Sequence, residues 1–300
     1  MTKFKLANAP CSWGTIENTE GERIDYSQML DELAESGYLG TELGDWGFMP
    51  TDPVELKEEL ESRRLELIAS WVSVRLYDKS FHQAGIKQAV KVAKLLAQVG
   101  GENALINIGD DHSTVINRYQ KTGRITKKDA MDNDTWKIYI DGIHRAAKAV
   151  KEETGLGVSF HPHAATYIET PKEIERFVEM TDPELVGLCF DTGHNLLGGG
   201  DPAQSILQYS DRIKLMHFKD FSKKLAQESY NQNHNYSQMI AAGVFSELGK
   251  GSVDFKAVLK VLKEINYQGW IVVEQDVLPG MGQPLKSAIY NRQYLNTIGI

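Results

Sequence analysis

The sequence is poor in cysteine, has no long apolar run and carries no excess of positive charge. Only Cys11 and Cys189 occur among its 300 residues, which is too few for a disulfide framework and typical of a reducing cytoplasm. No apolar stretch approaches the ~20 residues that span a bilayer. The polar start MTKFKLANAP is unlike a signal peptide. We therefore expect a cytoplasmic protein with no membrane partner.

The charge balance also narrows the class of partner. The formal net charge is -8 at pH 7, whereas a protein that binds a phosphate backbone needs clustered positive charge. We expect a small-molecule substrate and no nucleic acid. No long Ser/Gly/Pro-rich linker divides the chain, so residues 1–300 are predicted to form a single domain with a large core.

Short apolar runs that favour strands alternate with segments of helical period. Apolar residues recur at i, i+3, i+4 and i+7 within residues 26–33, 86–93 and 255–262, as in amphipathic helices. Such alternation predicts a parallel sheet with right-handed crossovers, and eight units predict a closed α/β barrel, the (β/α)8 TIM barrel. The expected strands are residues 4–10, 40–44, 66–73, 104–109, 157–163, 186–191, 213–220 and 270–276.

An open, doubly wound sheet is the alternative architecture. It would usually offer a Gly-rich phosphate turn after its first strand, and APCSWGTIEN is not such a turn. Two long connections, residues 109–135 and 219–253, are polar and irregular and follow the fourth and seventh strands. A barrel places both on the face where sites are built, so they are candidate lids. Plain surface insertions are the simpler interpretation.

Four ligand-type side chains stand at the ends of the last four expected strands. His161, Asp191, His217 and Glu274 would meet at one mouth in a closed barrel. Two imidazoles and two carboxylates suit Mn²⁺, Co²⁺, Fe²⁺ or Zn²⁺ better than Ca²⁺. Singly, each has a simpler role, such as a hydrogen-bonded core histidine, a capping aspartate or a glutamate paired with lysine. Together they predict a divalent-metal site.

Other strand-end residues are candidates for proton transfer and substrate contact. Lys219 follows His217 by two positions, so strand alternation aims both side chains to one face, and a nearby cation should lower the pKa of Lys219. Asp220 should point away and orient a loop, and Trp71 is as well suited to the core as to the site. Glu42 is equally compatible with a bond to a buried Lys or Arg. We assign proton transfer to Lys219, His194 and Glu274, and substrate contact to Glu42, His163, Trp13 and Trp46.

Several motifs resemble a known superfamily. FDTGHNLLGGGDP, RIKLMHFKD and GWIVVEQD resemble the sixth, seventh and eighth strand motifs of the xylose-isomerase-like TIM-barrel superfamily, which includes sugar isomerases, epimerases, dehydratases and apurinic endonucleases. With LANAPCSWG, GTELGDWGFMP, FHPHAAT and GVFSELGKGSVDF, the order from residue 6 to 276 resembles the inosose dehydratases. The sequence departs from the family pattern at two places. His161 stands where many superfamily members have Glu, and the stretch CSWGTIEN after the first strand is not typical of inosose dehydratases, so it bears on which polyol is the substrate.

The resemblance implies an activity and cofactors. It implies a metal-dependent lyase that removes water from 2-keto-myo-inositol in myo-inositol catabolism. The four positions above would bind Mn²⁺ or Co²⁺, with Zn²⁺ as an alternative. It also implies glutathione as a further cofactor and a homo-dimer or tetramer, on which the residues themselves are silent. Dehydration beside a ketone needs a base, an electrophile for the enolate oxygen and an acid, and no nicotinamide.

Three other functions remain open at this stage. A ketose isomerase or epimerase would use the same metal and a carboxylate such as Glu274 as base. A barrel that only binds sugars or a partner protein is suggested by His161 in place of Glu. An apurinic-site nuclease is disfavoured by the acidic charge balance.

Overall fold

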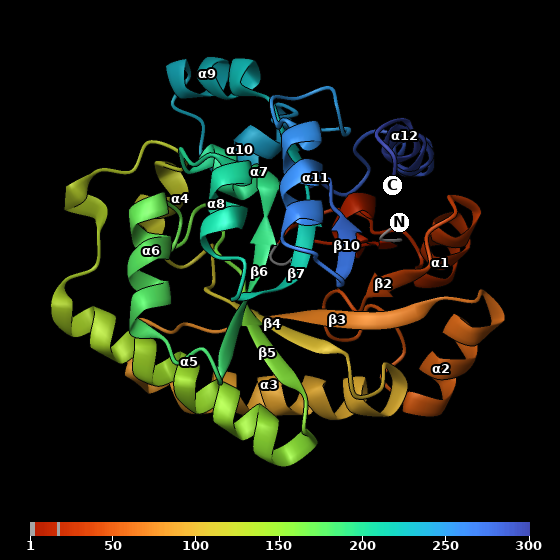
Figure 1. Cartoon of the computed structure of the whole chain (residues 1–300), viewed down its shortest axis with the longest axis horizontal. Coiled ribbons are helices and arrows are strands. Elements are labelled where there is room, and N and C mark those ends of the chain that lie inside the picture. Colours follow the sequence, from red (N-terminus) through yellow and green to blue (C-terminus); the bar gives the residue numbers. More distant parts are fainter. Residues whose placement is uncertain (1–3, 17–18) are drawn as a thin grey trace.

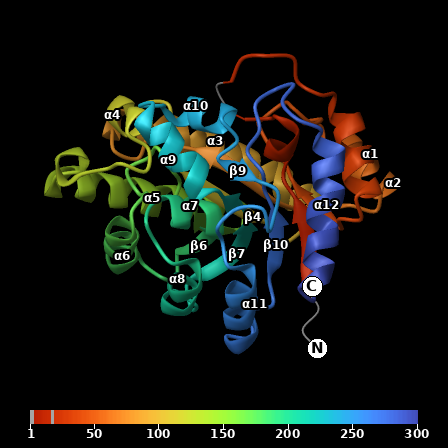
Figure 2. The ribbon, with the colours of Figure 1, turned by 90° about the horizontal axis from the view of Figure 1, so that it is seen from above.

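The computed structural model describes residues 4–16 and 19–300, and it contains the expected closed barrel. Eight parallel strands pair in the order β1-β10-β7-β6-β5-β4-β3-β2, and β1 pairs with β2 to close the ring (Figures 1 and 2). The prediction of a (β/α)8 barrel is confirmed. The strands are β1 Lys5–Asn8, β2 Gly40–Glu42, β3 Glu66–Ser73, β4 Leu105–Gly109, β5 Gly157–Phe160, β6 Val186–Asp191, β7 Ile213–Phe218 and β10 Trp270–Val273.

Helices surround the strands (Figure 1), and most begin at a side-chain cap. In α1, Asp25 accepts a hydrogen bond from the backbone of Ser27 at 2.9 Å, and in α6 Thr170 and Glu173 form a capping box, so exposed N–H groups gain partners. The barrel helices are α1 Tyr26–Glu35, α2 Pro53–Ser62, α3 Lys79–Val99, α5 Asn133–Thr154, α6 Pro171–Met180, α7 Thr192–Leu197, α8 Pro202–Gln208, α11 Phe255–Glu264 and α12 Pro284–Thr297. None within the described ranges is long and apolar enough to cross a membrane.

The core lies between the strands and this helical layer. Phe160 on β5 stacks on Phe177 of α6 with ring centroids 4.1 Å apart, and every residue of β6 is buried. Neighbouring strands are in register at their ends, so that Asp191 of β6 pairs with His217 of β7. Apolar residues on both sides of the sheet are thus buried in the core. The polar residues at the ends of the parallel strands lie side by side at one mouth of the barrel.

The two long connections are more regular than predicted. The first contains α4 Ile116–Gln120 and the turn η2 Lys127–Asp129, and the second contains β8 Asp220–Phe221, α9 Lys223–Asn231, α10 Tyr236–Ala241 and β9 Phe245–Ser246. Polar side-chain caps and a two-stranded sheet provide hydrogen-bond partners for the backbone of these connections. Because the connections contain few apolar residues, no periodic pattern predicted this regular structure. Arg124 donates to the carbonyls of Tyr230 and His234 and so joins the two connections.

Asp220 orients the second connection, as predicted. One of its carboxylate oxygens accepts from the backbone N–H groups of Gly249 and Gly251, each at 2.8 Å, and the other accepts from Val253 at 3.0 Å. A Cβ at position 251 would collide with the Asp220 carboxylate, so a glycine is required there. This carboxylate thus holds the Gly-rich turn that precedes α11.

Candidate active site and metal centre

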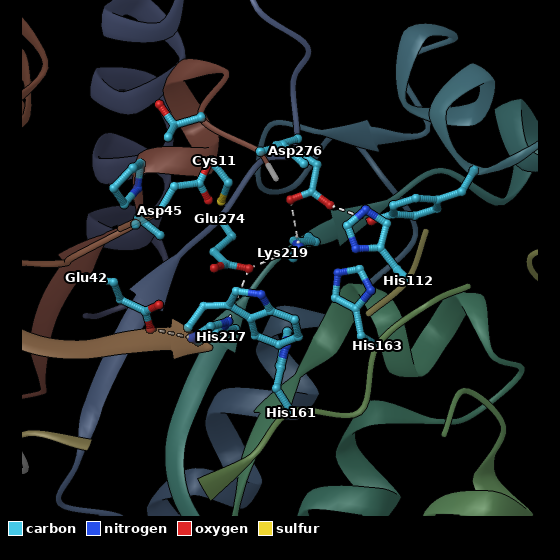
Figure 3. A pocket seen from close by; sticks show the side chains of 17 residues that line it. Cys11, Glu42, Asp45, His112, His161, His163, His217, Lys219, Glu274 and Asp276 are labelled. Atoms are coloured by element: carbon cyan, nitrogen blue, oxygen red, sulfur yellow. Dashed lines mark hydrogen bonds and ion pairs between the residues drawn. The ribbon is translucent and has the colours of Figure 1, made fainter. Parts of the chain in front are cut away.

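A cavity opens at the carboxyl ends of the strands. Figure 3 shows its wall, in which labelled side chains from the first, second, fourth, fifth, seventh and eighth βα units lie around one space. His161, His163, His217, Lys219 and Glu274 all line it. Polar strand ends predicted from sequence are therefore assembled around one space.

His161, Asp191, His217 and Glu274 form one group that could hold a divalent metal. One ligand atom from each lies within 4.8 Å of all the others, and all four residues are buried. The closest approach joins His217 Nδ1 to Glu274 Oε2 at 3.1 Å, and His161 Nε2 lies 3.8 Å from Asp191 Oδ2. Each residue follows or ends a different strand, so barrel closure alone brings them together.

Several polar atoms of this group have no hydrogen-bond partner. Among the described residues, both ring nitrogens of His161, Asp191 Oδ2 and His217 Nδ1 are buried and make no hydrogen bond, although His217 Nδ1 lies 3.1 Å from Glu274 Oε2. Asp191 combines two roles, because its other oxygen accepts from the backbone N–H of His194 at 2.7 Å and caps α7. Buried polar atoms without partners are rare, and their convergence on one point is what a cation would satisfy.

The electrostatics of the group also suit a cation. Burial lowers the pKa of His161 well below its ordinary value, so its imidazole is neutral and can offer a lone pair. Burial raises the pKa of Asp191 to about 6, although Lys219 opposes this rise. Burial would also raise the pKa of Glu274, but His217 and Lys219 bring it well below its ordinary value. Burial would lower the pKa of His217, but Cys189, Glu274 and Glu42 raise it well above its ordinary value, so a metal would displace a proton from this ring on binding. Two carboxylates and two histidines are the mixture typical of Mn²⁺, Co²⁺ or Zn²⁺.

Glu42 orients His217. His217 Nε2 donates to Glu42 Oε1 at 2.8 Å, and Asn107 Nδ2 donates to the same oxygen at 3.1 Å. This bond places the proton on Nε2 and leaves Nδ1 facing Glu274, an arrangement that metal-binding histidines commonly use. The alternative considered from sequence, a buried Lys or Arg as partner, is not observed, because the partners are His217 and Asn107. Glu42 also lines the cavity, so its contact with substrate stays a prediction.

Lys219 lies at the centre of a second set of contacts. Its Nζ is 2.9 Å from Asp276 Oδ1, 3.0 Å from Glu274 Oε2 and 3.0 Å from His194 Nε2. Burial would lower the pKa of Lys219, but Asp276, Glu274 and Asp191 raise it well above its ordinary value. The sequence-based expectation of a lowered pKa considered only the cation, and these carboxylates act in the opposite direction.

His163 and His194 occupy different positions relative to the cavity. His163 lines it, as expected from its spacing to His161, and its Nδ1 is 2.7 Å from the carbonyl oxygen of Ala164. That bond leaves Nε2 to accept a proton. His194 is 2% exposed and does not line the cavity, but it contacts Lys219 at 3.0 Å and its ring centroid lies 3.9 Å from that of His163, so it can position both side chains.

The tryptophans are arranged differently from the prediction. Trp13 lies in a 3-10 turn, η1 Pro10–Trp13, because β1 already ends at Asn8, and its indole donates to Glu32 at 2.7 Å. Trp46 packs against the core beside Lys91, whose Nζ is 4.0 Å from the ring centroid. Neither is among the residues that line the cavity, whereas Trp71 is. Trp71 packs edge-on against His161 with centroids 5.4 Å apart.

Some residues of the wall had no role assigned from sequence. Asp276 follows Glu274 by two positions, and strand alternation could have pointed to it. It accepts from Tyr236 Oη at 3.0 Å. Tyr236 and His112 come from the long connections, where no periodic pattern signalled them. Cys11 also lines the cavity, and burial raises the pKa of its thiol well above the ordinary value, so it is not an activated nucleophile.

Comparisons with known proteins agree with this architecture. The family model described as xylose isomerase-like TIM barrel matches residues 30–295. An inosose dehydratase of Geobacillus kaustophilus is 31% identical over 300 residues, covering 99% of this chain and 96% of that protein. An inosose dehydratase of Clostridium tetani is 32% identical over 294 residues, covering 98% and 96%. A solved structure of IOLI protein with a binding zinc atom superposes with a TM-score of 0.69 at 16% identity, covering 98% of both chains, and shares the fold.

Proposed function

This chain belongs to the xylose isomerase-like TIM-barrel family and, within it, to the inosose dehydratases, and from this premise we propose that it removes water from 2-keto-myo-inositol. The reaction would make it a hydro-lyase of myo-inositol catabolism. Relatives that match over nearly the whole chain support the proposal. The observation that carries it is the buried group His161, Asp191, His217 and Glu274 with Lys219 directly beside it.

We propose that this group holds a divalent metal, Mn²⁺ or Co²⁺ first and Zn²⁺ as the alternative. The unpaired atoms of His161, Asp191 and His217 fit such an ion. When bound, the ion supplies the positive charge that stabilises the enolate oxygen formed from the ketone. His217 is held for this role by Glu42, at 2.8 Å.

The side chains around the cavity can carry the two proton transfers. His163 accepts the proton from the carbon next to the ketone at Nε2, because its Nδ1 is engaged with the Ala164 carbonyl. Lys219 donates a proton to the departing hydroxyl, which leaves as water while the double bond forms. Asp276 and Glu274 orient the lysine through bonds of 2.9 and 3.0 Å. Trp71 offers an apolar wall for one face of the ring.

The direct test uses purified protein freed of metal by a chelator. It is incubated with 2-keto-myo-inositol and Mn²⁺, Co²⁺ or Zn²⁺, and the absorbance of the enedione product is followed. We expect product only after a metal is returned. Folded protein that forms no product with any of the three metals, both with and without added glutathione, would refute the proposal.

The same incubation in deuterated solvent distinguishes dehydration from the alternative isomerase or epimerase reaction. A ketose isomerase or epimerase would exchange substrate protons with deuterated solvent, visible by NMR, without loss of water. Glutathione as a further cofactor, a homo-dimer or tetramer, and a cytoplasmic location stay predictions. Adding glutathione to the assay and measuring the solution mass test the first two.

A further inference from the structure

A second group of ligand-type side chains lies next to the first. One ligand atom from each of His163, His194 and Asp276 lies within 4.8 Å of the other two. They come from three separate segments, which follow β5, lie in α7 and follow β10. Two imidazoles and a carboxylate are a common donor set for a transition metal. None of the three belongs to the group that we propose for the catalytic metal.

The amino group of Lys219 contacts two members of this second group. Lys219 Nζ is 2.9 Å from Asp276 Oδ1 and 3.0 Å from His194 Nε2. A third contact, 3.0 Å to Glu274 Oε2, reaches the first group. An ammonium has three N–H donors; two of them reach the carboxylates of Asp276 and Glu274, and the third side of the nitrogen faces the ring of His194. The side chain is 1% exposed.

Glu274 connects the two groups. Its Oε2 is 3.1 Å from His217 Nδ1 on one side and 3.0 Å from Lys219 Nζ on the other. A carboxylate shared between two adjacent cations is the arrangement expected of a two-cation site. Gly193 makes room for the lysine, because a Cβ at that position would lie 2.8 Å from Lys219 Cγ.

From this arrangement we infer that the barrel mouth has two adjacent cation positions and that the amino group of Lys219 fills the second. The inference rests on the proposed metal site at the first position. An ordinary buried ion pair would need only the carboxylates, and it would not require the imidazole of His194 beside the same nitrogen, with the ring of His163 3.9 Å from that of His194. The chain therefore binds one divalent metal, and removing the lysine side chain opens a site for a second.

The chemical consequence concerns the leaving group. A metal ion at the second position would polarise an oxygen, whereas an ammonium carries a proton of its own that it can transfer to that oxygen. A lysine at this position thus suits the loss of a hydroxyl group as water next to the stabilised enolate. The second position would take a borderline cation such as Zn²⁺ or Co²⁺ once the lysine is removed.

The experiment measures metal content. Wild type and Lys219→Ala are stripped with a chelator, loaded with excess Zn²⁺, dialysed and analysed by inductively coupled plasma mass spectrometry. We expect one equivalent per chain in the wild type and two in Lys219→Ala. Lys219→Arg, which keeps a cation at the position, should hold one. The double variant Lys219→Ala/His194→Ala lacks a ligand of the second site and should return to one.

Thermal unfolding with and without Zn²⁺ covers the case of a poorly folded variant. The alanine substitution leaves Asp276 and Glu274 without their partner, so metal-free Lys219→Ala should be less stable, and its Tm should rise as the second equivalent binds. One equivalent in Lys219→Ala at saturating Zn²⁺, or no recovery of folding with Zn²⁺, would overturn the inference. So would two equivalents in the double variant.

The outcomes also separate this inference from the proposed function. Wild type that holds one metal but does not dehydrate 2-keto-myo-inositol would refute the function alone, provided that Lys219→Ala gains a second ion. An active wild type whose Lys219→Ala variant gains no ion would refute the second position alone.

Discussion

Substitution of Glu42 by Gln tests whether His217 is held as a metal ligand. Glu42 is 4% exposed, and its Oε1 accepts from His217 Nε2 at 2.8 Å. Glutamine has the same shape and can still offer an oxygen, but it lacks the negative charge. The substitution therefore removes the electrostatic part of the contact and leaves the packing in place.

The expected magnitude follows from the position of Glu42 behind the ligand. Loss of a partner of this kind typically costs 10–100-fold in metal affinity, which corresponds to about 1.4–2.7 kcal/mol. The carboxylate makes its histidine ligand more basic and fixes the orientation of the ring. We expect Glu42→Gln to weaken Mn²⁺ or Zn²⁺ binding by about 10–100-fold. The Tm of the metal-free protein should change less than it does when one of the four ligand residues is replaced by alanine.

Competition against a chromogenic chelator measures the affinity. Glu66→Gln is the matched control, since Glu66 begins β3 and its half-exposed side chain pairs with Lys5 at 3.0 Å, away from the cavity. It should bind metal like the wild type. An affinity of Glu42→Gln within twofold of wild type, or an equal loss in Glu66→Gln, would show that His217 does not depend on this carboxylate.

Three further outcomes are expected. His217→Ala or Asp191→Ala should abolish both metal retention and dehydration with little loss of secondary structure, checked by metal analysis and circular dichroism; full activity after chelation and metal return would contradict the ligand assignment. Gly193→Ala should push Lys219 aside, since its Cβ would lie 2.8 Å from Lys219 Cγ, and lower kcat by about tenfold or more, measured by steady-state kinetics; an unchanged kcat would count against Lys219. Burial raises the pKa of Glu169 from 4.5 to about 7, so the folded state favours the protonated form, and the free energy of unfolding should fall as pH rises from about 4.5 to 7 and level off above. Glu169→Gln should remove that part of the slope in urea titrations from pH 5 to 8, and parallel profiles for both proteins would refute it.

Local sequence patterns were sufficient for the scaffold. Periods of two and of about 3.6 residues distinguish strands from helices wherever one face is buried, and the strand–helix order then leaves few topologies. Asp191 and His217 could be identified because the ends of parallel strands meet at one mouth. Lys219 could be placed at the same mouth, because side chains two positions apart on a strand, such as those of His217 and Lys219, point to the same face.

Residues on the connections could not be placed in the same way. His112 and Tyr236 reach the cavity from segments whose path depends on caps and on contacts between the two long connections, such as those of Arg124. Trp13 was misplaced because Pro10 starts a 3-10 turn directly after β1, which redirects the side chain toward α1. No periodic pattern records such turns.

The sequence by itself determined the barrel and the strand-end donors of the metal group, because burial patterns and chain order are local properties that close into one ring. Only the tertiary structure decided that Glu42 holds His217 and that Lys219 lies between Asp276, Glu274 and His194. Those contacts join strands distant in the chain, and their partners depend on side-chain directions within a few ångströms, which no one-dimensional pattern encodes.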